Sequence, residues 1–140
     1  MCGDIRRAGP QDGHLFDRVA EDVFDAPIDH SALTNFLSAP DHLMVIGLSD
    51  GQVVGQGRAM IHFSPDEAPQ LYIDNLGVTP TLQRRGLGVA IVQELLNWGS
   101  ERGCRGAWVA TESDNMGAIG LYEHLGGRGQ SMVYFEYPLG

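Results

Sequence analysis

The amino-acid sequence predicts one α+β domain with a mixed sheet, built in the order βααβββαβαβ. Three observations support this fold class. Apolar residues recur with the two-residue period of strands in some segments and with helical spacing in others. At 140 residues and 43% hydrophobic content, the chain has the length of one domain and enough apolar side chains for a core. It contains no linker, repeat or low-complexity tract that would divide it.

The first three elements are a strand and two helices. Residues 2–9 alternate as a short strand, and residues 10–24 place apolar side chains at helical spacing after a proline, at Leu15, Val19 and Val23. A second helix is expected over 29–39, with Pro40 ending it. Asp29 is the expected N-terminal cap of this second helix.

Three strands follow in the middle of the chain. Residues 42–49 and 52–63 flank Asp50-Gly51, a dipeptide that suits the tight turn of a β-hairpin. Residues 70–78 form the next strand, which is unusual in carrying Asp74 and Asn75 in the middle of its run.

The last part of the sequence alternates helices and strands. A long helix is expected over 84–102, with Gly103 as its C-terminal cap. A short apolar strand over 106–112 and a helix over 115–126 come next. Residues 131–139 are predicted to close the sheet as its sixth strand.

The composition narrows the classes of ligand. The net charge is −9 and all nine basic residues are arginine, which predicts no nucleic-acid binding and favours a cationic small molecule. The two cysteines and five histidines lack metal-ligand spacing, so no metal site is expected. No run of apolar residues is long enough to span a membrane and no secretory pattern opens the chain. We therefore expect no membrane association and a cytoplasmic location.

The stretch "QRRGLG", residues 83–88, predicts an anion site at the start of the long helix. Glycines allow a ligand to approach the backbone closely, and the first turn of a helix presents free N–H groups and a positive dipole end. The spacing of a dinucleotide-binding motif is missing, and a P-loop lysine is absent. The alternative is a glycine-rich helix start that only packs tightly.

A second motif is "NMGAIGLYEHLGG", residues 115–127. Asn115 and Tyr122 are seven positions apart and are therefore expected on one side of a helix. A tyrosine on an apolar helix face needs a partner for its hydroxyl group. An ordinary core or rim tyrosine is the alternative interpretation.

Together the two motifs resemble the GNAT superfamily of acetyl-coenzyme A-dependent N-acetyltransferases. The family's Gln/Arg-x-x-Gly-x-Gly/Ala signature is matched by Gln83-Arg84-Arg85-Gly86-Leu87-Gly88, and its Leu-x-Val strand pattern by Leu76-Gly77-Val78. The family's second motif is matched by Asn115, Ala118, Leu121, Tyr122 and Gly126. The resemblance implies a mostly antiparallel central sheet flanked by four helices.

The resemblance also assigns the cosubstrate, acetyl-CoA, to particular residues. The amides of Arg84, Arg85, Gly86, Leu87, Gly88 and Val89 would hold its pyrophosphate. The backbone of Leu76, Gly77 and Val78 would pair with the pantetheine arm like an added strand. Asn115 would hold the same arm from the other side.

Acetyl transfer to an amine needs a base, a proton donor and an oxyanion contact. By resemblance, Tyr122 would protonate the leaving thiolate, and the N–H of Leu76, at a strand bulge, would stabilise the oxyanion. Two carboxylates are candidates for the base: Asp74 in the strand 70–78, and Glu112 at the end of the strand 106–112, expected beside it. Glu136 is a third candidate.

Within the superfamily, the chain most resembles the small aminoglycoside 3-N-acetyltransferases. That subgroup has an aspartate where this chain has Asn75 and a tyrosine where it has Asp74, a shift that would turn the carboxylate to the other face of a regular strand. The expected acceptor is a small cationic amine such as an aminoglycoside or polyamine, with Asp25 and Asp29 as candidate cation contacts. A protein or peptide amine and a non-catalytic acyl-CoA sensor are the alternatives. Relatives are often dimers, so the resemblance allows a homodimer, while the sequence itself does not fix the oligomeric state.

Overall fold

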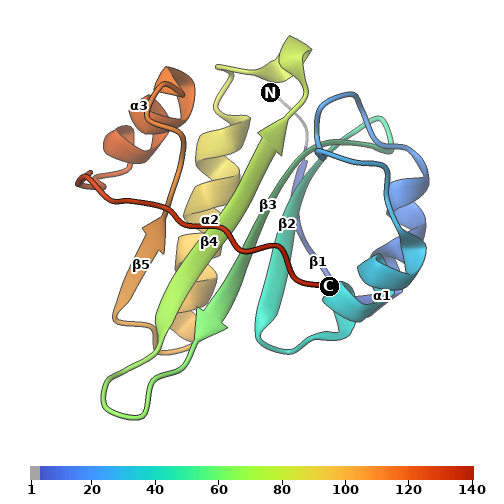
Figure 1. The fold of residues 1–140 in the computed structure, drawn as a ribbon. Helices are drawn as coiled ribbons and strands as arrows, with labels where there is room; N and C mark the ends of the chain where they lie inside the picture. The colour runs from blue at the N-terminus through green and yellow to red at the C-terminus, as the bar shows by residue number, and fades with distance from the viewer. Residues whose placement is uncertain (1–3) are drawn as a thin grey trace. The chain divides into compact units, whose positions relative to one another are not determined.

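A computed structural model describes residues 4–140, which divide into two compact units on either side of the Ala110–Thr111 bond. The first unit contains a five-stranded sheet, and the second contains one helix (Figure 1). The elements of the first unit are β1 (Asp4–Ala8), the 3-10 helix η1 (Pro10–Asp17), α1 (His30–Ser38), β2 (His42–Ser49), β3 (Gln52–His62), β4 (Gln70–Val78), the 3-10 helix η2 (Pro80–Leu82), α2 (Leu87–Glu101) and β5 (Gly106–Val109). The second unit contains α3 (Met116–His124).

The sheet confirms the predicted mixed α+β class. Its strands lie in sequence order, β1-β2-β3-β4-β5. The first three pairs are antiparallel, and only β4 and β5 run parallel, because α2 carries the chain back across the sheet between them. Asp50 and Gly51, both with positive φ, form the predicted two-residue turn between β2 and β3.

The two faces of the sheet carry different elements. Met44 and Ile46 of β2 belong to a core cluster with Phe16 of η1 and Leu33 of α1. Gly47 of β2 faces α2 instead, because successive residues of a strand point to opposite faces. Figure 1 shows α2 running along the sheet opposite η1 and α1.

The close packing of α2 depends on glycines beneath it. A Cβ added at Gly47 would lie 2.7 Å from Leu87 Cδ1, and one at Gly57 would lie 2.6 Å from Ile91 Cγ2. Leu87 and Ile91 are both buried. The missing Cβ atoms therefore let the helix that begins the candidate anion site sit directly on β2 and β3.

We expect Gly57→Ala to lower the free energy of unfolding by about 1–3 kcal/mol, because the new methyl group overpacks the interface with α2. Urea unfolding followed by circular dichroism measures the change. Gly120→Ala is the matched control: Gly120 is exposed in α3 with nothing within 4 Å of an added Cβ. That variant should be equally or more stable, by up to about 1 kcal/mol, and equal losses in both variants would contradict the packing argument.

Three predicted elements differ from the structure. The helix expected over 10–24 is the shorter η1, because Arg18 and Ala20 instead form backbone hydrogen bonds with Val53. The strand expected over 106–112 ends at Val109. The sixth strand expected over 131–139 is not formed, and no described strand pairs with this segment to satisfy its backbone groups. The start of the first predicted strand, including Cys2, lies outside the described residues.

Helix ends agree more closely with the sequence. Asp29 caps α1 by accepting a hydrogen bond from the Ala32 N–H at 3.0 Å, as predicted. Gly103 has φ +85 and closes α2. Gly126 has φ +92 and follows α3. The long helix begins at Leu87 rather than Arg84, since Arg84 and Gly86 both have left-handed backbone angles.

Candidate active site

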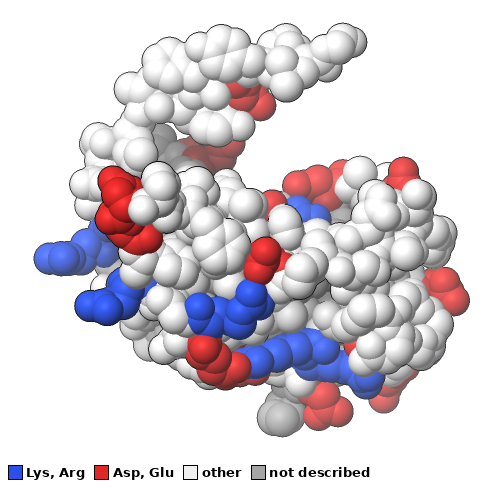
Figure 2. Space-filling model, turned by 90° about the horizontal axis from the view of Figure 1, so that it is seen from below, with Lys and Arg blue, Asp and Glu red and all other residues white. Residues whose placement is uncertain are grey.

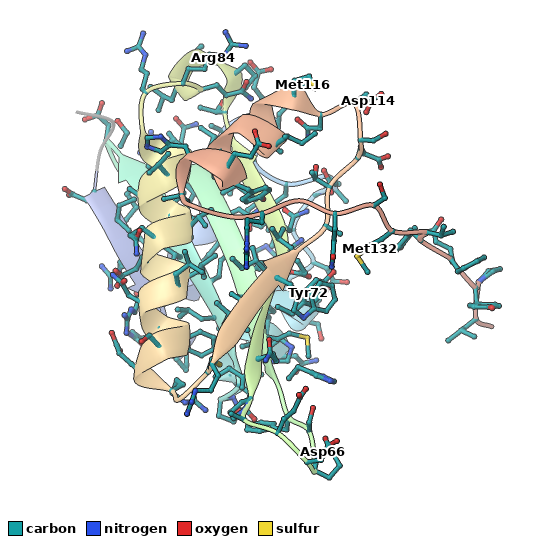
Figure 3. The ribbon with its side chains drawn as sticks, turned by 90° about the vertical axis from the view of Figure 1, so that its left-hand side faces the viewer. Asp66, Tyr72, Arg84, Asp114, Met116 and Met132 are labelled. Atoms are coloured by element: carbon teal, nitrogen blue, oxygen red, sulfur yellow. The ribbon has the colours of Figure 1, made fainter. Side chains whose placement is uncertain are left out.

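The first part of the site is the loop that leads into α2. Arg84 has φ +64 and Gly86, the N-cap of the helix, has φ +87. A non-glycine residue in the left-handed region is uncommon, and such residues concentrate at binding sites. Figure 3 shows Arg84 at the end of the first unit where α2 begins, whereas Asp66 marks the opposite end, in the connection from β3 to β4. The loop is exposed from Gln83 to Gly86.

The geometry of this loop fits an anion. The first backbone bond of α2 runs from the Ala90 N–H to the Gly86 carbonyl, so the N–H groups of Leu87, Gly88 and Val89 have no acceptor within the helix. Gly86 has no side chain to cap them, and nothing lies within 4 Å of its Cβ position. Arg84 and Arg85 add positive charge beside these donors. Gln83 instead donates from Nε2 to the Val78 carbonyl at 3.0 Å, which ties the loop to β4.

The second part of the site is an open edge of β4. Along one side, Leu76, Gly77 and Val78 pair with Gly57, Gln56 and Gly55 of β3, respectively. On the other side, β5 pairs only with Gln70–Ile73. Within the described residues, the Leu76–Val78 segment therefore has one side without a strand neighbour. An extended group could form backbone hydrogen bonds there.

A bulge places two polar side chains of β4 on one face of the sheet. Arg58 pairs with Asn75 and Ala59 with Ile73, so Asp74 is the extra residue. The Arg58 Nε lies 3.7 Å from Oδ1 of Asp74, and the neighbouring Gln56 Nε2 lies 2.7 Å from Oδ1 of Asn75. Gln56 and Arg58 are two residues apart and share a face, so Asp74 and Asn75 share it too.

This arrangement corrects two expectations. A regular strand would turn Asp74 and Asn75 to opposite faces, but the bulge removes that alternation. The bulge was expected at Leu76, but it lies at Asp74, two residues earlier in the strand. Asp74 keeps 44% of its side chain exposed, so its carboxylate is accessible to a ligand.

The segment between η1 and α1 borders these side chains. The Phe24 ring lies below Arg58, with Cζ 6.0 Å from the ring centroid. A cavity of about 310 Å³ is formed by this segment, and its lining is Val19, Ala20, Phe24, Asp25, Ala26, Pro27 and Ile28. An aromatic ring and a carboxylate, Asp25, together suit a cation. Asp29 serves as the cap of α1 and is not among the lining residues.

A stacked aromatic pair extends the same face. Tyr72 of β4, which Figure 3 labels, and Trp108 of β5 have ring centroids 4.2 Å apart. Trp108 is half-exposed at 48%. Because Tyr72 lies two residues before Asp74 along β4, the two rings form an apolar surface close to Asp74.

The second unit contains the remaining candidate residues. Asn115 is the N-cap of α3 and not part of the helix: its Oδ1 accepts from the Ala118 N–H at 3.1 Å. Its amide nitrogen makes no hydrogen bond to the residues that the structure describes. Tyr122 lies within α3, and burial raises the pKa of its hydroxyl above the ordinary tyrosine value. The phenol therefore stays protonated across the neutral range.

Glu112 does not end a strand, contrary to expectation. It is exposed and lies between β5 and α3, where its carbonyl accepts from the Asn115 N–H at 3.1 Å. Glu136 lies in the irregular C-terminal segment, with Oε2 3.4 Å from the Tyr134 hydroxyl. Of the three carboxylates considered, Asp74 is the one on the bulged strand.

Sequence reasoning missed Gln56, Arg58 and Phe24. The signal for the first two was present, since they are polar residues in the middle of the otherwise apolar run of β3. Their importance depends on contacts with residues 16 to 34 positions away, which no local pattern encodes.

In the part of the chain that the structure describes, neither the charged residues nor the cysteine forms a competing site. Figure 2 shows arginine and acidic side chains intermixed on the face it presents, without a continuous basic surface. Among residues 4–140, no group of three or more histidine, cysteine, aspartate or glutamate side chains is placed to bind a metal ion. Cys104 is a free cysteine that lines a cavity of about 190 Å³, and burial raises the pKa of its thiol. Over the same residues, no helix has the length and apolar character needed to cross a bilayer.

Relatives of known activity were found by sequence. An aminoglycoside N(6')-acetyltransferase type 1 from Salmonella typhimurium is 26% identical over 130 residues, covering 90% of this chain and 79% of the relative. A ribosomal protein bS18 alanine N-acetyltransferase from Escherichia coli K12 is 40% identical over 64 residues, covering 46% of this chain and 43% of the relative. The aminoglycoside relative is named for the 6' position, whereas the sequence motifs suggested the 3-N subgroup.

Solved structures of similar fold include two aminoglycoside acetyltransferases. The soil metagenomic enzyme meta-AAC0020, in complex with trehalose, has a TM-score of 0.84 at 21% identity, with 98% of this chain and 96% of that chain covered. AAC(6')-Iy in complex with a CoA-containing bisubstrate analogue has a TM-score of 0.81 at 22% identity, with 98% of both chains covered. At these identities the likeness establishes the fold.

The model of the acetyltransferase (GNAT) family matches residues 13–127, which include the loop before α2, the bulged strand β4 and the Asn115–Tyr122 motif. Acetyl-CoA is the cosubstrate of this family, and the N–H groups at the start of α2, which have no acceptor within the helix, fit its pyrophosphate. The chain therefore belongs to the GNAT family, and it is an acetyl-CoA-dependent acetyltransferase.

Proposed function

We propose that this acetyltransferase moves the acetyl group of acetyl-CoA to a primary amine of a small cationic acceptor, such as an aminoglycoside or polyamine, by direct attack within a ternary complex. The observation that carries the proposal is the half-exposed Asp74 carboxylate on the bulge of β4. Its ion-pair partner Arg58 lies over the ring of Phe24, which lines the cavity together with Asp25. The aminoglycoside acetyltransferase relative, which covers 90% of the chain, supports the same acceptor class.

The cosubstrate is proposed to lie along the loop and the open strand edge. The amides from Arg84 to Val89 hold the pyrophosphate, with Arg84 and Arg85 contributing charge. The Leu76–Val78 backbone pairs with the pantetheine arm, for which the unpaired side of β4 leaves hydrogen-bonding groups. Asn115 contributes its free amide nitrogen to the same arm. Gln83 acts through its bond to Val78, which fixes the loop relative to the strand.

The protein's residues then handle the protons of the transfer. An alkyl ammonium has a pKa of about 10, so a base must remove its proton before the nitrogen can attack the acetyl carbonyl. Asp74 takes this proton, directly or through water, and Glu112 is the alternative. The Leu76 N–H stabilises the carbonyl oxygen as it gains negative charge. As the carbon–sulfur bond breaks, Tyr122 gives its proton to the leaving thiolate. The acylated nitrogen loses its remaining extra proton through water, and this proton restores the Tyr122 phenol.

A peptide α-amino group is the second candidate acceptor. The bS18 alanine acetyltransferase relative favours it, with 40% identity over 64 residues. A protein substrate needs an extended groove, whereas the cavity beside Phe24 is a compact space of about 310 Å³. The small acceptor is therefore the better supported of the two.

We further propose that residues 1–140 act as one catalytic domain in the cytoplasm, where acetyl-CoA is available, and that the chain forms a homodimer. The family match crosses the boundary between the two units, which supports a single functional domain. The net charge of −9 argues against nucleic acid as a partner.

The experiment that tests the acceptor follows release of free coenzyme A thiol from acetyl-CoA with a panel of amines: aminoglycosides, polyamines, amino acids and short peptides. Turnover with an aminoglycoside or polyamine supports the proposal, and turnover with peptides alone overturns it in favour of the second candidate. Tight acetyl-CoA binding without turnover of any amine would instead favour the alternative that the protein is a non-catalytic acyl-CoA sensor. Asp74→Asn and Glu112→Gln then distinguish the two candidate bases by which one loses activity.

A further inference from the structure

Gln56 is a polar side chain with no exposed surface in the middle of β3. Its Nε2 donates two hydrogen bonds, to the Val23 carbonyl at 3.1 Å and to Oδ1 of Asn75 at 2.7 Å. The Val23 carbonyl can only accept, so the nitrogen end of the amide must face it. The opposite end, Oε1, is buried without a partner among the described residues. An apolar side chain would avoid this unfavourable burial but would leave Val23 and Asn75 without a donor.

The first of these bonds holds the segment 22–28 against β4. Gln56 is paired in register with Gly77, and a Cβ at Gly77 would overlap the Val23 carbonyl oxygen. The chain at Val23 therefore rests directly on the backbone of β4, with Gln56 as its hydrogen-bond donor. Phe24 and Asp25 follow immediately and line the cavity proposed to receive the amine. Their distance from Asp74 thus depends on this junction.

The second bond fixes the direction of the Asn75 amide. Because Oδ1 faces Gln56, Nδ2 is turned away from it as a donor. Asn75 makes no other side-chain hydrogen bond to the residues that the structure describes. It is half-buried and lies on the same face as the Asp74 carboxylate. Nδ2 of Asn75 is thus a hydrogen-bond donor beside the candidate base Asp74, where it can bind an oxygen atom of the acceptor close to the reacting amine.

We propose that Gln56 is the positioning residue of the acceptor site. It holds the segment 22–28 on β4 and directs Nδ2 of Asn75 toward a hydroxyl or carbonyl oxygen adjacent to the acceptor's amine. The acceptor class is accordingly an amine with a neighbouring oxygen function, such as an amino sugar, rather than a simple polyamine. The inference rests on the proposed function, which it deepens.

Two variants and their double mutant test the proposal. Gln56→Leu should raise KM for the amine about tenfold and leave KM for acetyl-CoA unchanged, since it removes both bonds on the acceptor side only. Asn75→Ala should raise the same KM about fivefold. The double variant should be no worse than Gln56→Leu alone, because Asn75 acts through an orientation that Gln56 sets. Multiplied effects in the double variant would overturn the coupling.

Hydrogen exchange gives a readout that does not need activity. Amides of the segment 22–28 should exchange about tenfold faster in Gln56→Leu, while those of α2 should be unchanged. Gln93→Leu is the matched control, because Gln93 is exposed on α2 and, among residues 4–140, its side chain forms a hydrogen bond with Asn97 alone. Unchanged exchange of 22–28 in Gln56→Leu would overturn the positioning role, even if no amine were turned over by the wild type. If Gln56→Leu fails to fold, Asn75→Ala still tests the proposal. An unchanged KM for the amine in that variant would overturn the role of Asn75 Nδ2.

Discussion

Gly86→Val is expected to weaken acetyl-CoA binding by about 100-fold or more. Gly86 has φ +87, a conformation that a β-branched residue strongly disfavours, so the loop before α2 would change its path. Its Cβ position is open, so the valine side chain would also occupy space proposed for the pyrophosphate. Losing two charge-assisted hydrogen bonds accounts for a change of this size. Isothermal titration calorimetry with acetyl-CoA measures it.

Gly103→Val is the matched control for that experiment. Gly103 has φ +85, nothing lies within 4 Å of its Cβ position, and it follows the other end of α2. The backbone strain is therefore comparable, but the anion-binding end of the helix is untouched. Gly103→Val should lower stability and keep wild-type affinity for acetyl-CoA. Normal affinity in Gly86→Val would remove the loop as the pyrophosphate site.

Tyr122→Phe is expected to lower kcat by about 100-fold or more, with little change in the affinity for acetyl-CoA. The substitution removes the hydroxyl that is proposed to protonate the leaving thiolate and keeps the ring in α3. Steady-state kinetics and calorimetry on one preparation separate the two effects. Tyr137→Phe is the control, since Tyr137 is 80% exposed in the C-terminal segment. Unchanged turnover in Tyr122→Phe would eliminate Tyr122 as the proton donor.

The pH profile adds a second measure of the same residue. Burial raises the pKa of Tyr122, so the protonated donor persists above the ordinary tyrosine value of about 10. The wild-type kcat should therefore show no alkaline decline from this group until the pH exceeds about 10. A decline that begins near neutral pH and disappears in Tyr122→Phe would contradict the raised pKa.

Several features of this protein were determined by the sequence alone, because they depend on the conformation of a few neighbouring residues. Asp50-Gly51 specifies the hairpin between β2 and β3, and Asp29 caps α1. Gly103 marks the C-terminal end of α2, since glycine adopts positive φ without a steric penalty. The glycine-rich start of α2 and the Asn115–Tyr122 motif also identified the family and its cosubstrate.

Other features were decided only by the tertiary structure, because they depend on pairing between distant segments. The helix expected over 10–24 is shorter in the structure, because the backbone groups of Arg18 and Ala20 form hydrogen bonds with Val53. The bulge that brings Asp74 and Asn75 to one face exists only through the register of β4 with β3. Gln56 resembles any polar residue in a strand until its two bonds, to Val23 and Asn75, are known. Local patterns determine the tight turn and the helix caps, whereas the side chains that surround an acceptor are set by long-range contacts.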